Sequence, residues 1–246
     1  LFAAGLPMTN KNQAAYTYAH CSNAETVVAM TSPAAAQVLL DHYEACYNRY
    51  GDCARGVDWP NRDDADVRYR VMLAPALAAG HRSVHDYGCG LGHLYEYLHR
   101  AGLADRFDYS GSDGSALFVD ACRHKFPDVN FDQLNVTEPD FEPQRYCAKY
   151  EHIIANGVFT EKRELDFDAM WAYTRQALLR LFDMCSECLS VNFMSIHVDY
   201  ERDDLFHLPA DTLLEFCRRN LTRHVTLVAD YGLYEYTARI YKNPQT

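Results

Sequence analysis

The stretch SVHDYGCGLGHLYEYLHRAG, residues 83–102, decides the fold class of this chain. Its apolar start predicts a strand, and the periodic apolar positions of its second half predict a helix. Between the two, Gly88, Gly90 and Gly92 stand at alternate positions, where glycine permits a sharp turn and a close approach to a ligand. Free N–H groups at the start of a helix attract polar or anionic groups. We therefore predict a strand, turn and helix that bind a small ligand.

Strand and helix patterns alternate through the middle of the chain. Regular alternation of this kind predicts a parallel sheet with helices on both faces. The predicted strands cover 83–87, 107–112, 129–134, 150–155 and 189–194, and the predicted helices cover 91–100, 115–126 and 168–188.

The C-terminal part departs from this alternation. After a short predicted helix over 211–219, two strands are predicted over 225–229 and 234–241. The connection between these strands is too short for a helical crossover, so they must pair antiparallel. We expect an α/β protein with a mostly parallel sheet and an antiparallel finish.

The part before residue 81 has a different pattern. Ser32-Pro33 offers an N-cap followed by a first-turn proline, which predicts the start of a helix. A second helix is predicted over 68–79, and a loop rich in Gly, Pro and Asp separates the two. We expect residues 1–80 to form an N-terminal helical lid or extension, and residues 81–246 to form the ligand-binding catalytic domain.

The glycine spacing indicates which kind of nucleotide is bound. A dinucleotide fingerprint is G-x-G-x-x-G, but His93 occupies the third position after Gly90, which favours a nucleoside without a pyrophosphate. Asp113 ends the next predicted strand, where an acidic side chain accepts hydrogen bonds from ribose hydroxyls. The alternative is a turn in which Asp113 or Ser115 is the N-cap of the next helix. The spacing after a glycine turn favours the ribose contact.

These ordered motifs resemble those of the class I S-adenosylmethionine (SAM) dependent methyltransferases. The resemblance rests on the Asp86-x-Gly88-x-Gly90-x-Gly92 motif, Asp113, FDQLNV and IIANGVF, and it extends over residues 83–242. It implies a Rossmann-like, seven-stranded fold with SAM as the cofactor. The implied cofactor contacts are Asp86, Gly88, Gly90 and Gly92 for the methionine part, Asp113 for the ribose, Asn135 and the Val136 backbone for the adenine, and Asn156 and Gly157 beneath the sulfonium. Gly114 and Ser115, which follow Asp113, are further expected cofactor contacts.

Three further segments are similar to a bacterial subgroup that methylates small molecules. They are YGDCARGVDWPNRDDADVRYRVML, ANGVF and DYGLYEYTARIYK. This similarity implies that Trp59 covers the cofactor and that Arg68 pairs with its carboxylate. A core tryptophan and a surface salt bridge are the open alternatives.

Methyl transfer from a sulfonium requires alignment of the acceptor, exclusion of water and removal of a proton. Candidate bases lie at the carboxyl ends of the strands, where FMSIHVDY offers His197 as the first choice, besides Asp199 and Tyr200. The alternative for His197 is a solvated loop histidine. Asn156, beneath the sulfonium, is the second catalytic candidate.

The N-terminal segment NQAAYTYAH adds two more candidates, Tyr16 and Tyr18. If this segment covers the cofactor as a lid, their rings could hold the sulfonium by cation–π attraction, worth roughly 0.5–2 kcal/mol. An aromatic helix packed on the domain is the alternative.

Histidine and cysteine spacing does not predict a metal site. His81 and His85 are spaced like a metal-binding pair, but His85 lies within the first predicted strand, where we expect a packed histidine. The nine cysteines are expected to be free thiols. Cys185 and Cys188 form a C-x-x-C near the end of a predicted helix, without the second pair that a zinc site needs.

Charge and hydropathy favour a small-molecule partner. The net charge of −11 would repel nucleic-acid phosphates and anionic membranes. No apolar run approaches the roughly 18 residues needed to cross a bilayer, and the start of the chain does not read as a signal peptide. We expect a cytoplasmic protein, monomeric or homodimeric, that binds neither nucleic acid nor membrane.

The sequence leaves three functions open. The first is a methyltransferase that acts on a hydroxyl, amine or carboxylate of a small molecule in bacterial, specialised metabolism. The second is a SAM-consuming enzyme that cyclises the aminobutyrate chain of SAM to azetidine-2-carboxylate and releases methylthioadenosine. The third is a SAM-binding protein without catalytic activity.

Overall fold

The computed structural model describes residues 33–245. Its strands are β1 Ser83–Tyr87, β2 Asp108–Asp113, β3 Asn130–Gln133, β4 Tyr150–Ala155, β5 Cys185–Met194, β6 Val225–Val228 and β7 Glu235–Tyr241. They form a seven-stranded sheet in the order β3-β2-β1-β4-β5-β7-β6. The first five strands are parallel, and β7 pairs antiparallel with β5 and β6. The predicted Rossmann-like fold and its antiparallel end are therefore confirmed.

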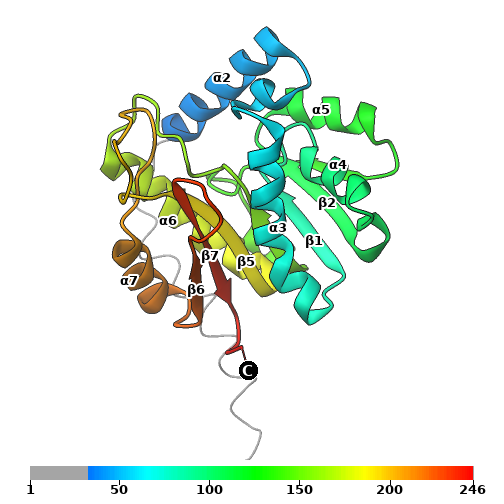
Figure 1. Cartoon of the computed structure of the whole chain (residues 1–246). Coiled ribbons are helices and arrows are strands. Elements are labelled where there is room, and N and C mark those ends of the chain that lie inside the picture. The colour runs from blue at the N-terminus through cyan, green and yellow to red at the C-terminus, as the bar shows by residue number, and fades with distance from the viewer. Residues whose placement is uncertain (1–32, 246) are drawn as a thin grey trace, which may run out of the picture. The chain divides into compact units, whose positions relative to one another are not determined.

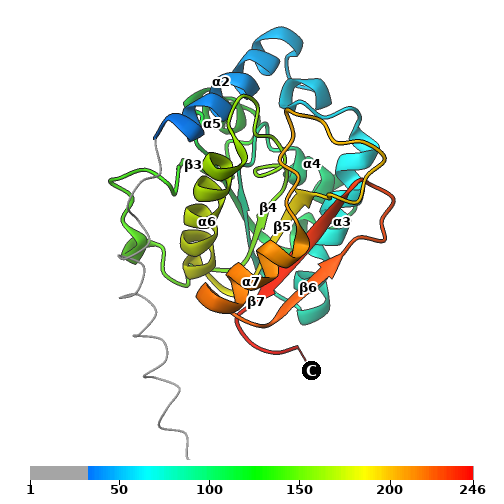
Figure 2. The ribbon, with the colours of Figure 1, turned by 90° about the vertical axis from the view of Figure 1, so that its left-hand side faces the viewer.

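Helices cover both faces of this sheet. They are α2 Pro33–Tyr50, α3 Arg62–Ala79, α4 His93–Arg100, α5 Ala116–Lys125, α6 Phe167–Met184 and α7 Ala210–Asn220, with short 3-10 turns η2 Ala54–Val57, η3 Ala104–Arg106 and η4 Pro143–Arg145. Buried residues of α3, α4 and α5 share one hydrophobic cluster, and those of α6 and α7 share another. Figure 2 shows α3 and α6 on opposite sides of the sheet. Figure 1 shows α2 across the upper edge of the sheet.

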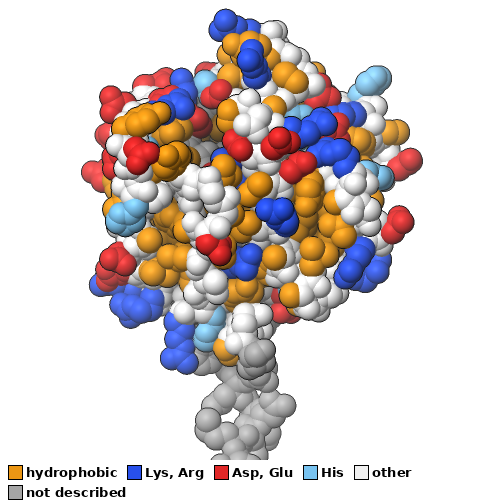
Figure 3. Space-filling model, in the orientation of Figure 1, with side chains coloured by type: hydrophobic (Ala, Val, Ile, Leu, Met, Phe, Trp, Pro, Cys, Tyr) orange, Lys and Arg blue, Asp and Glu red, His pale blue; other side chains and the backbone are white. Residues whose placement is uncertain are grey.

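The surface of the described residues carries mixed charge. On the face drawn in Figure 3, basic and acidic side chains are interspersed with hydrophobic ones. Among the described helices, none has the length and apolar character needed to cross a bilayer.

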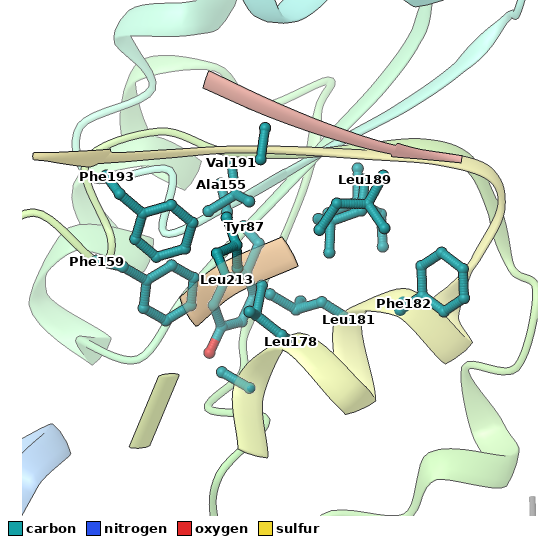
Figure 4. Packing of buried hydrophobic residues seen from close by; sticks show 14 of the residues in the cluster. Tyr87, Ala155, Phe159, Leu178, Leu181, Phe182, Leu189, Val191, Phe193 and Leu213 are labelled. Carbon is teal, nitrogen blue, oxygen red and sulfur yellow. The ribbon is translucent and has the colours of Figure 1, made fainter. Parts of the chain in front are cut away.

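Alternation along β5 divides its side chains between the two faces of the sheet. Leu189 and Phe193 face α6, where Leu178 and Leu181 point back toward the sheet (Figure 4). On the other face, the Ser190 hydroxyl donates to the backbone carbonyl of Met72 in α3 over 3.2 Å. Burial of a leucine of this kind stabilises a fold by roughly 1.5–3 kcal/mol, so the contact with α6 stabilises this part of the sheet.

Two predicted boundaries are wrong. Helix α3 begins at Arg62 and not at residue 68, because the Asn61 side chain caps it and accepts a hydrogen bond from Asp64 N–H over 2.8 Å. Helix α6 ends at Met184, and β5 begins at Cys185, so the C-x-x-C lies within a strand. The apolar run there is compatible with either period, which is why the pattern misplaced the boundary. The predicted N-cap Ser32 lies outside the described residues.

The cysteines of the described part are free thiols, as predicted. Cys185 and Cys188 are both fully buried. Burial raises the pKa of the Cys185 thiol to about 12. A protonated, buried thiol is neither a good nucleophile nor a ready metal ligand, so these two residues contribute to the core.

Candidate active site

A cavity opens at the carboxyl ends of β1, β2 and β4. The strand order changes direction between β1 and β4, which is where ligands bind in open α/β sheets. We call this cavity the first cavity. The predicted cofactor residues that line it are Trp59, Gly88, Gly90, Asp113, Gly114, Asn135, Asn156 and Gly157.

The Asp113 carboxylate connects the two predicted motifs. It accepts hydrogen bonds from Gly90 N–H and from Ser115 N–H, each over 2.9 Å. Burial raises the pKa of Asp113 to about 6, although both N–H groups oppose the shift. The carboxylate is thus fixed in place at the end of β2, where it can accept hydroxyl donors from a ligand.

The glycine turn has the shape that only glycine permits. Gly88 has φ of 71°, and a Cβ there would lie 2.4 Å from Val158 Cγ2. Gly90 has φ of 52° and also lines the cavity. Gly92 does not line it: its φ is 74°, and a Cβ there would lie 2.9 Å from Phe126. The third glycine therefore lets α4 pack closely, while the first two shape the cavity.

Three more predicted cofactor residues lie beneath the lining. Asp86 is buried and accepts a hydrogen bond from the Tyr109 hydroxyl over 2.9 Å. Burial raises the pKa of Asp86 to about 7. Ser115 caps α5 and donates its hydroxyl proton to Glu44 of α2 over 2.6 Å. Val136 N–H donates to the Tyr87 hydroxyl, so these three residues hold the elements around the cavity in place through hydrogen bonds.

Two asparagines in the lining differ in their hydrogen bonding. Asn135 Oδ1 accepts from Thr137 N–H, and its amide donates to Glu138, so this side chain is held in a local turn. Asn156 Oδ1 is buried without a hydrogen-bond partner among the described residues. A buried acceptor of this kind costs free energy unless a ligand supplies a donor, which fits a binding role for Asn156.

Helix α2 and the segment after it cover the first cavity. Leu39, Leu40 and Tyr43 of α2 line its upper side, together with Val57 and Trp59. The Tyr43 hydroxyl donates to the Gly157 carbonyl over 3.3 Å, which ties the cover to the end of β4. The sequence predicts the start of this helix, but nothing in it singles out Tyr43 as a site residue.

A second cavity adjoins the first. The two share Tyr43, Val57 and Trp59 as common wall residues. The second cavity lies between the start of α3, the loop after β5 and the turn before β7. Its charged lining residues are Asp58, Asp64, Arg68, Glu161, Asp199, Arg202 and Glu235.

Arg68 lies on the wall of the second cavity and does not line the first. Its Nε lies 2.8 and 2.9 Å from the two carboxylate oxygens of Glu235, and both side chains are buried. Its guanidinium also stacks over the Trp59 ring, 4.1 Å from the centroid. Burial raises the pKa of Glu235, and the charge of Arg68 opposes this shift. The predicted contact of Arg68 with a cofactor carboxylate stays a prediction.

The predicted base His197 is exposed and lines neither cavity. Its backbone N–H donates to the Ser195 hydroxyl over 3.0 Å. Asp199 and Tyr200, from the same segment, do line the second cavity. Tyr16 and Tyr18 lie outside the described residues.

Two histidines of the sheet, His85 and His152, are buried, and His85 is packed within its strand as predicted. The two ring nitrogens of His85 lie 2.8 and 2.9 Å from the hydroxyls of Ser110 and Ser112. Burial lowers the pKa of both His85 and His152 to about 3, so both rings stay neutral. Side-chain hydroxyls, and not the backbone, satisfy the His85 ring.

One group of potential metal ligands occurs among residues 33–245. The ligand atoms of His42, Cys46 and Asp58 lie within 4.8 Å of one another. His42 Nε2 is 2.7 Å from Asp58 Oδ2, a hydrogen bond that holds α2 to the segment after η2. This bond accounts for the arrangement, and we assign no metal to it.

The strand order, the glycine turn and the cavity at the switch point together define a nucleoside-binding enzyme of the Rossmann-like class. No protein-family model matches the chain. A Mycobacterium tuberculosis protein that bears the name of a methyltransferase, Rv1506c, is 31% identical over 169 residues, which are 67% of this chain and 96% of that protein. The chain belongs to the class I SAM-dependent methyltransferase family.

Solved structures share the fold. Magnesium protoporphyrin IX methyltransferase from Synechocystis PCC 6803, with bound SAM, gives a TM-score of 0.54 at 15% identity and covers 85% of this chain and 97% of that one. The 1,6-didemethyltoxoflavin-N1-methyltransferase of Burkholderia thailandensis, with its substrate and S-adenosylhomocysteine (SAH), gives 0.51 at 15% identity and covers 97% and 93%.

Proposed function

We propose that this protein transfers the methyl group of SAM to a hydroxyl, amine or carboxylate of a small metabolite. The observation that carries the proposal is the second cavity, which adjoins the first through Tyr43, Val57 and Trp59. A methyltransferase needs two adjoining sites, one for SAM and one for the acceptor. Specialised bacterial metabolism, a cytoplasmic location and a monomer or homodimer are part of the same proposal.

The first cavity is the proposed SAM site. Gly88 and Gly90 allow the close approach of the methionine part, and Asp113 offers a fixed acceptor for the ribose hydroxyls. Asn135, which lines the same cavity, is the proposed adenine contact, and the unpaired Asn156 Oδ1 lies beside Gly157. Asp86, Gly92, Ser115 and Val136 hold this lining in shape.

SAM supplies an electrophilic methyl carbon: the acceptor oxygen or nitrogen bonds to it, the carbon–sulfur bond breaks with its electron pair left on sulfur as SAH, and a hydroxyl or amine acceptor also loses a proton. Glu161 is the proposed proton acceptor. It lines the second cavity, is buried, and its pKa is raised by burial, while Arg163 opposes this shift at 3.0 Å. A raised pKa strengthens a carboxylate as a base. Burial and, after it, the charge of Glu161 raise the pKa of Tyr43, which indicates that Glu161 lies near the shared wall.

The covering segment has the proposed role of excluding water. Residues 33–60 line the first cavity from above, whereas α3 packs its buried Met72 and Leu73 on the sheet. A lid that reaches back to Tyr16 and Tyr18 remains part of the proposal. Closure over SAM would strengthen every polar contact in the site.

The second cavity also favours methyl transfer over cyclisation of SAM. An enzyme that cyclises the aminobutyrate chain needs a closed pocket without room for another reactant. The second cavity offers such room beside the first. A protein that only binds SAM would not need a second cavity for an acceptor.

The test is to incubate the purified protein with SAM, with and without a pool of small metabolites, and to identify the products by liquid chromatography and mass spectrometry. SAH together with a methylated metabolite is expected. Methylthioadenosine from SAM alone, or bound SAM that stays unchanged with every metabolite, would contradict the proposal. Glu161→Gln should lower SAH release, and Glu164→Gln, an exposed neighbour, is the matched control.

A further inference from the structure

We propose that the second cavity selects a small amine that also carries a carbonyl or carboxylate oxygen, the chemistry of an amino acid or its derivative. This inference rests on the proposed function, because it takes the second cavity as the acceptor site. It adds the charge and the polar groups by which the acceptor is recognised.

The lining of the second cavity has more negative than positive groups. Five carboxylates stand against two guanidinium groups. Arg68 is paired with Glu235, and Arg202 is paired with Asp204 through its Nε at 3.0 Å. The positive charges of the wall are therefore already neutralised by partners of their own.

Three aspartates of the lining have no such partner. Within residues 33–245, Asp58, Asp64 and Asp199 form no ion pair with a lysine or an arginine. Asp58 lies 2.7 Å from His42, Asp64 accepts from the Asn61 amide over 3.0 Å, and Asp199 accepts from the Tyr234 hydroxyl over 2.7 Å. The wall therefore carries unbalanced negative charge, which attracts a cation and repels an anion.

Exposed aromatic rings stand at the same site. Tyr200 and Tyr234 line the second cavity, and with 75% and 61% exposure they are the most exposed large hydrophobic side chains of the described residues. Trp59 and Tyr43 line its inner side. Aromatic faces beside carboxylates favour an ammonium group, because the ring quadrupole attracts a cation.

A buried hydrogen-bond donor, Arg68 Nη1, accounts for the oxygen acceptor of the proposed ligand. Arg68 is 8% exposed, lines the second cavity, and its Nη1 has no hydrogen-bond partner among the described residues. The charge of Arg68 is paired with Glu235, but a buried N–H group without an acceptor is costly, so a ligand oxygen beside Nη1 would be favoured. Carboxylates at the aspartates and one free donor at Arg68 together match an amine that carries an oxygen acceptor.

The test uses two matched pairs of probes that differ only in the α-amino group. Phenylalaninamide is compared with 3-phenylpropanamide, and leucinamide with 4-methylpentanamide, by calorimetric titration into the protein saturated with SAH. The amine of each pair should bind about five- to tenfold more tightly, and added salt should reduce the difference. Phenethylamine, which lacks the carbonyl, should bind more weakly than phenylalaninamide.

Two variants test which carboxylate causes the preference for the amine. Asp199→Asn should remove most of the preference for the amine, and Asp203→Asn, an exposed neighbour outside the lining, should leave it unchanged. Equal binding of both members of each pair, binding of none of them, or an equal effect of the two variants would overturn the inference. Failure of SAH to bind would instead count against the proposed function, and the amine preference would then be measured on the protein without SAH.

Discussion

Gly157 lies directly against the indole ring of Trp59: a Cβ on Gly157 would lie 2.6 Å from Trp59 Cζ2. Gly157 also has φ of 79°, and its carbonyl accepts hydrogen bonds from the hydroxyls of Tyr43 and Thr160. The end of β4 and the cover of the first cavity therefore meet at a position that has no room for a side chain.

We expect Gly157→Ala to displace Trp59 and to weaken SAM binding about tenfold or more. The matched control is Gly232→Ala, because Gly232 has nearly the same φ, 78°, but no atom within 4 Å of an added Cβ. Both variants carry the backbone strain of alanine at positive φ, roughly 1–2 kcal/mol, and only one creates a collision. Calorimetry measures the affinities. Equal loss in both variants would mean that the contact with Trp59 is unimportant for SAM.

A second prediction concerns pH. Burial raises the pKa of Asp113 from 3.8 to about 6. The ionised carboxylate accepts the ribose hydroxyls, so SAM affinity should fall as the pH is lowered through 6, by about tenfold per unit. The stability of the protein without SAM should change in the opposite direction. Between pH 3.8 and about 6 the folded state retains a proton on Asp113 that the unfolded state releases. The contribution of Asp113 to the free energy of unfolding therefore falls as the pH rises through this range.

Calorimetric titrations between pH 5 and pH 8 measure the first trend, and urea unfolding measures the second. Asp113→Asn should flatten both. Asp86→Asn distinguishes the titration of Asp113 from that of the neighbouring carboxyl group of Asp86, whose pKa is raised to about 7. If Asp86→Asn abolishes the pH dependence of binding and Asp113→Asn does not, the ribose assignment is wrong.

The parts of the fold that could be predicted from the sequence depend on local patterns. The glycine turn and Asp113 could be assigned because they end consecutive parallel strands, and parallel strands end at the same edge. The start of β5 could not, since the apolar run around Cys185 fits either a helix or a strand. The second cavity could not be predicted either, because Glu161 and Asp199 come from segments that only the folded chain brings together.

A third prediction concerns the thiols. Cys185 and Cys188 are fully buried, and burial raises the pKa of both, so they should resist alkylation in the native protein. Cys53 and Cys147 are exposed and should react first with iodoacetamide. Peptide mapping after brief labelling gives the order. Early labelling of Cys185 or Cys188 would show that the N-terminal end of β5 opens readily.

The last prediction concerns the buried ion pair of Arg68 and Glu235. Arg68→Met should remove the cation and leave Glu235 buried without its partner, a loss of about 3–5 kcal/mol in the free energy of unfolding. The matched control on the same helix is Arg62→Met, which removes an exposed pair with Glu96 at 3.6 Å and should cost less than about 1 kcal/mol.

The loss in Arg68→Met should also depend on pH. Burial already raises the pKa of Glu235, and removal of the opposing charge would raise it further. A carboxyl group with a raised pKa favours the folded state at low pH and disfavours it as the pH rises through the interval between its unfolded and folded values. Urea unfolding of this variant should therefore show a larger loss at pH 8 than at pH 5, while Arg62→Met shows little change. A loss no greater than that of Arg62→Met at both pH values would mean that water reaches Glu235 in the variant, because only a solvated carboxylate tolerates the absence of its cation.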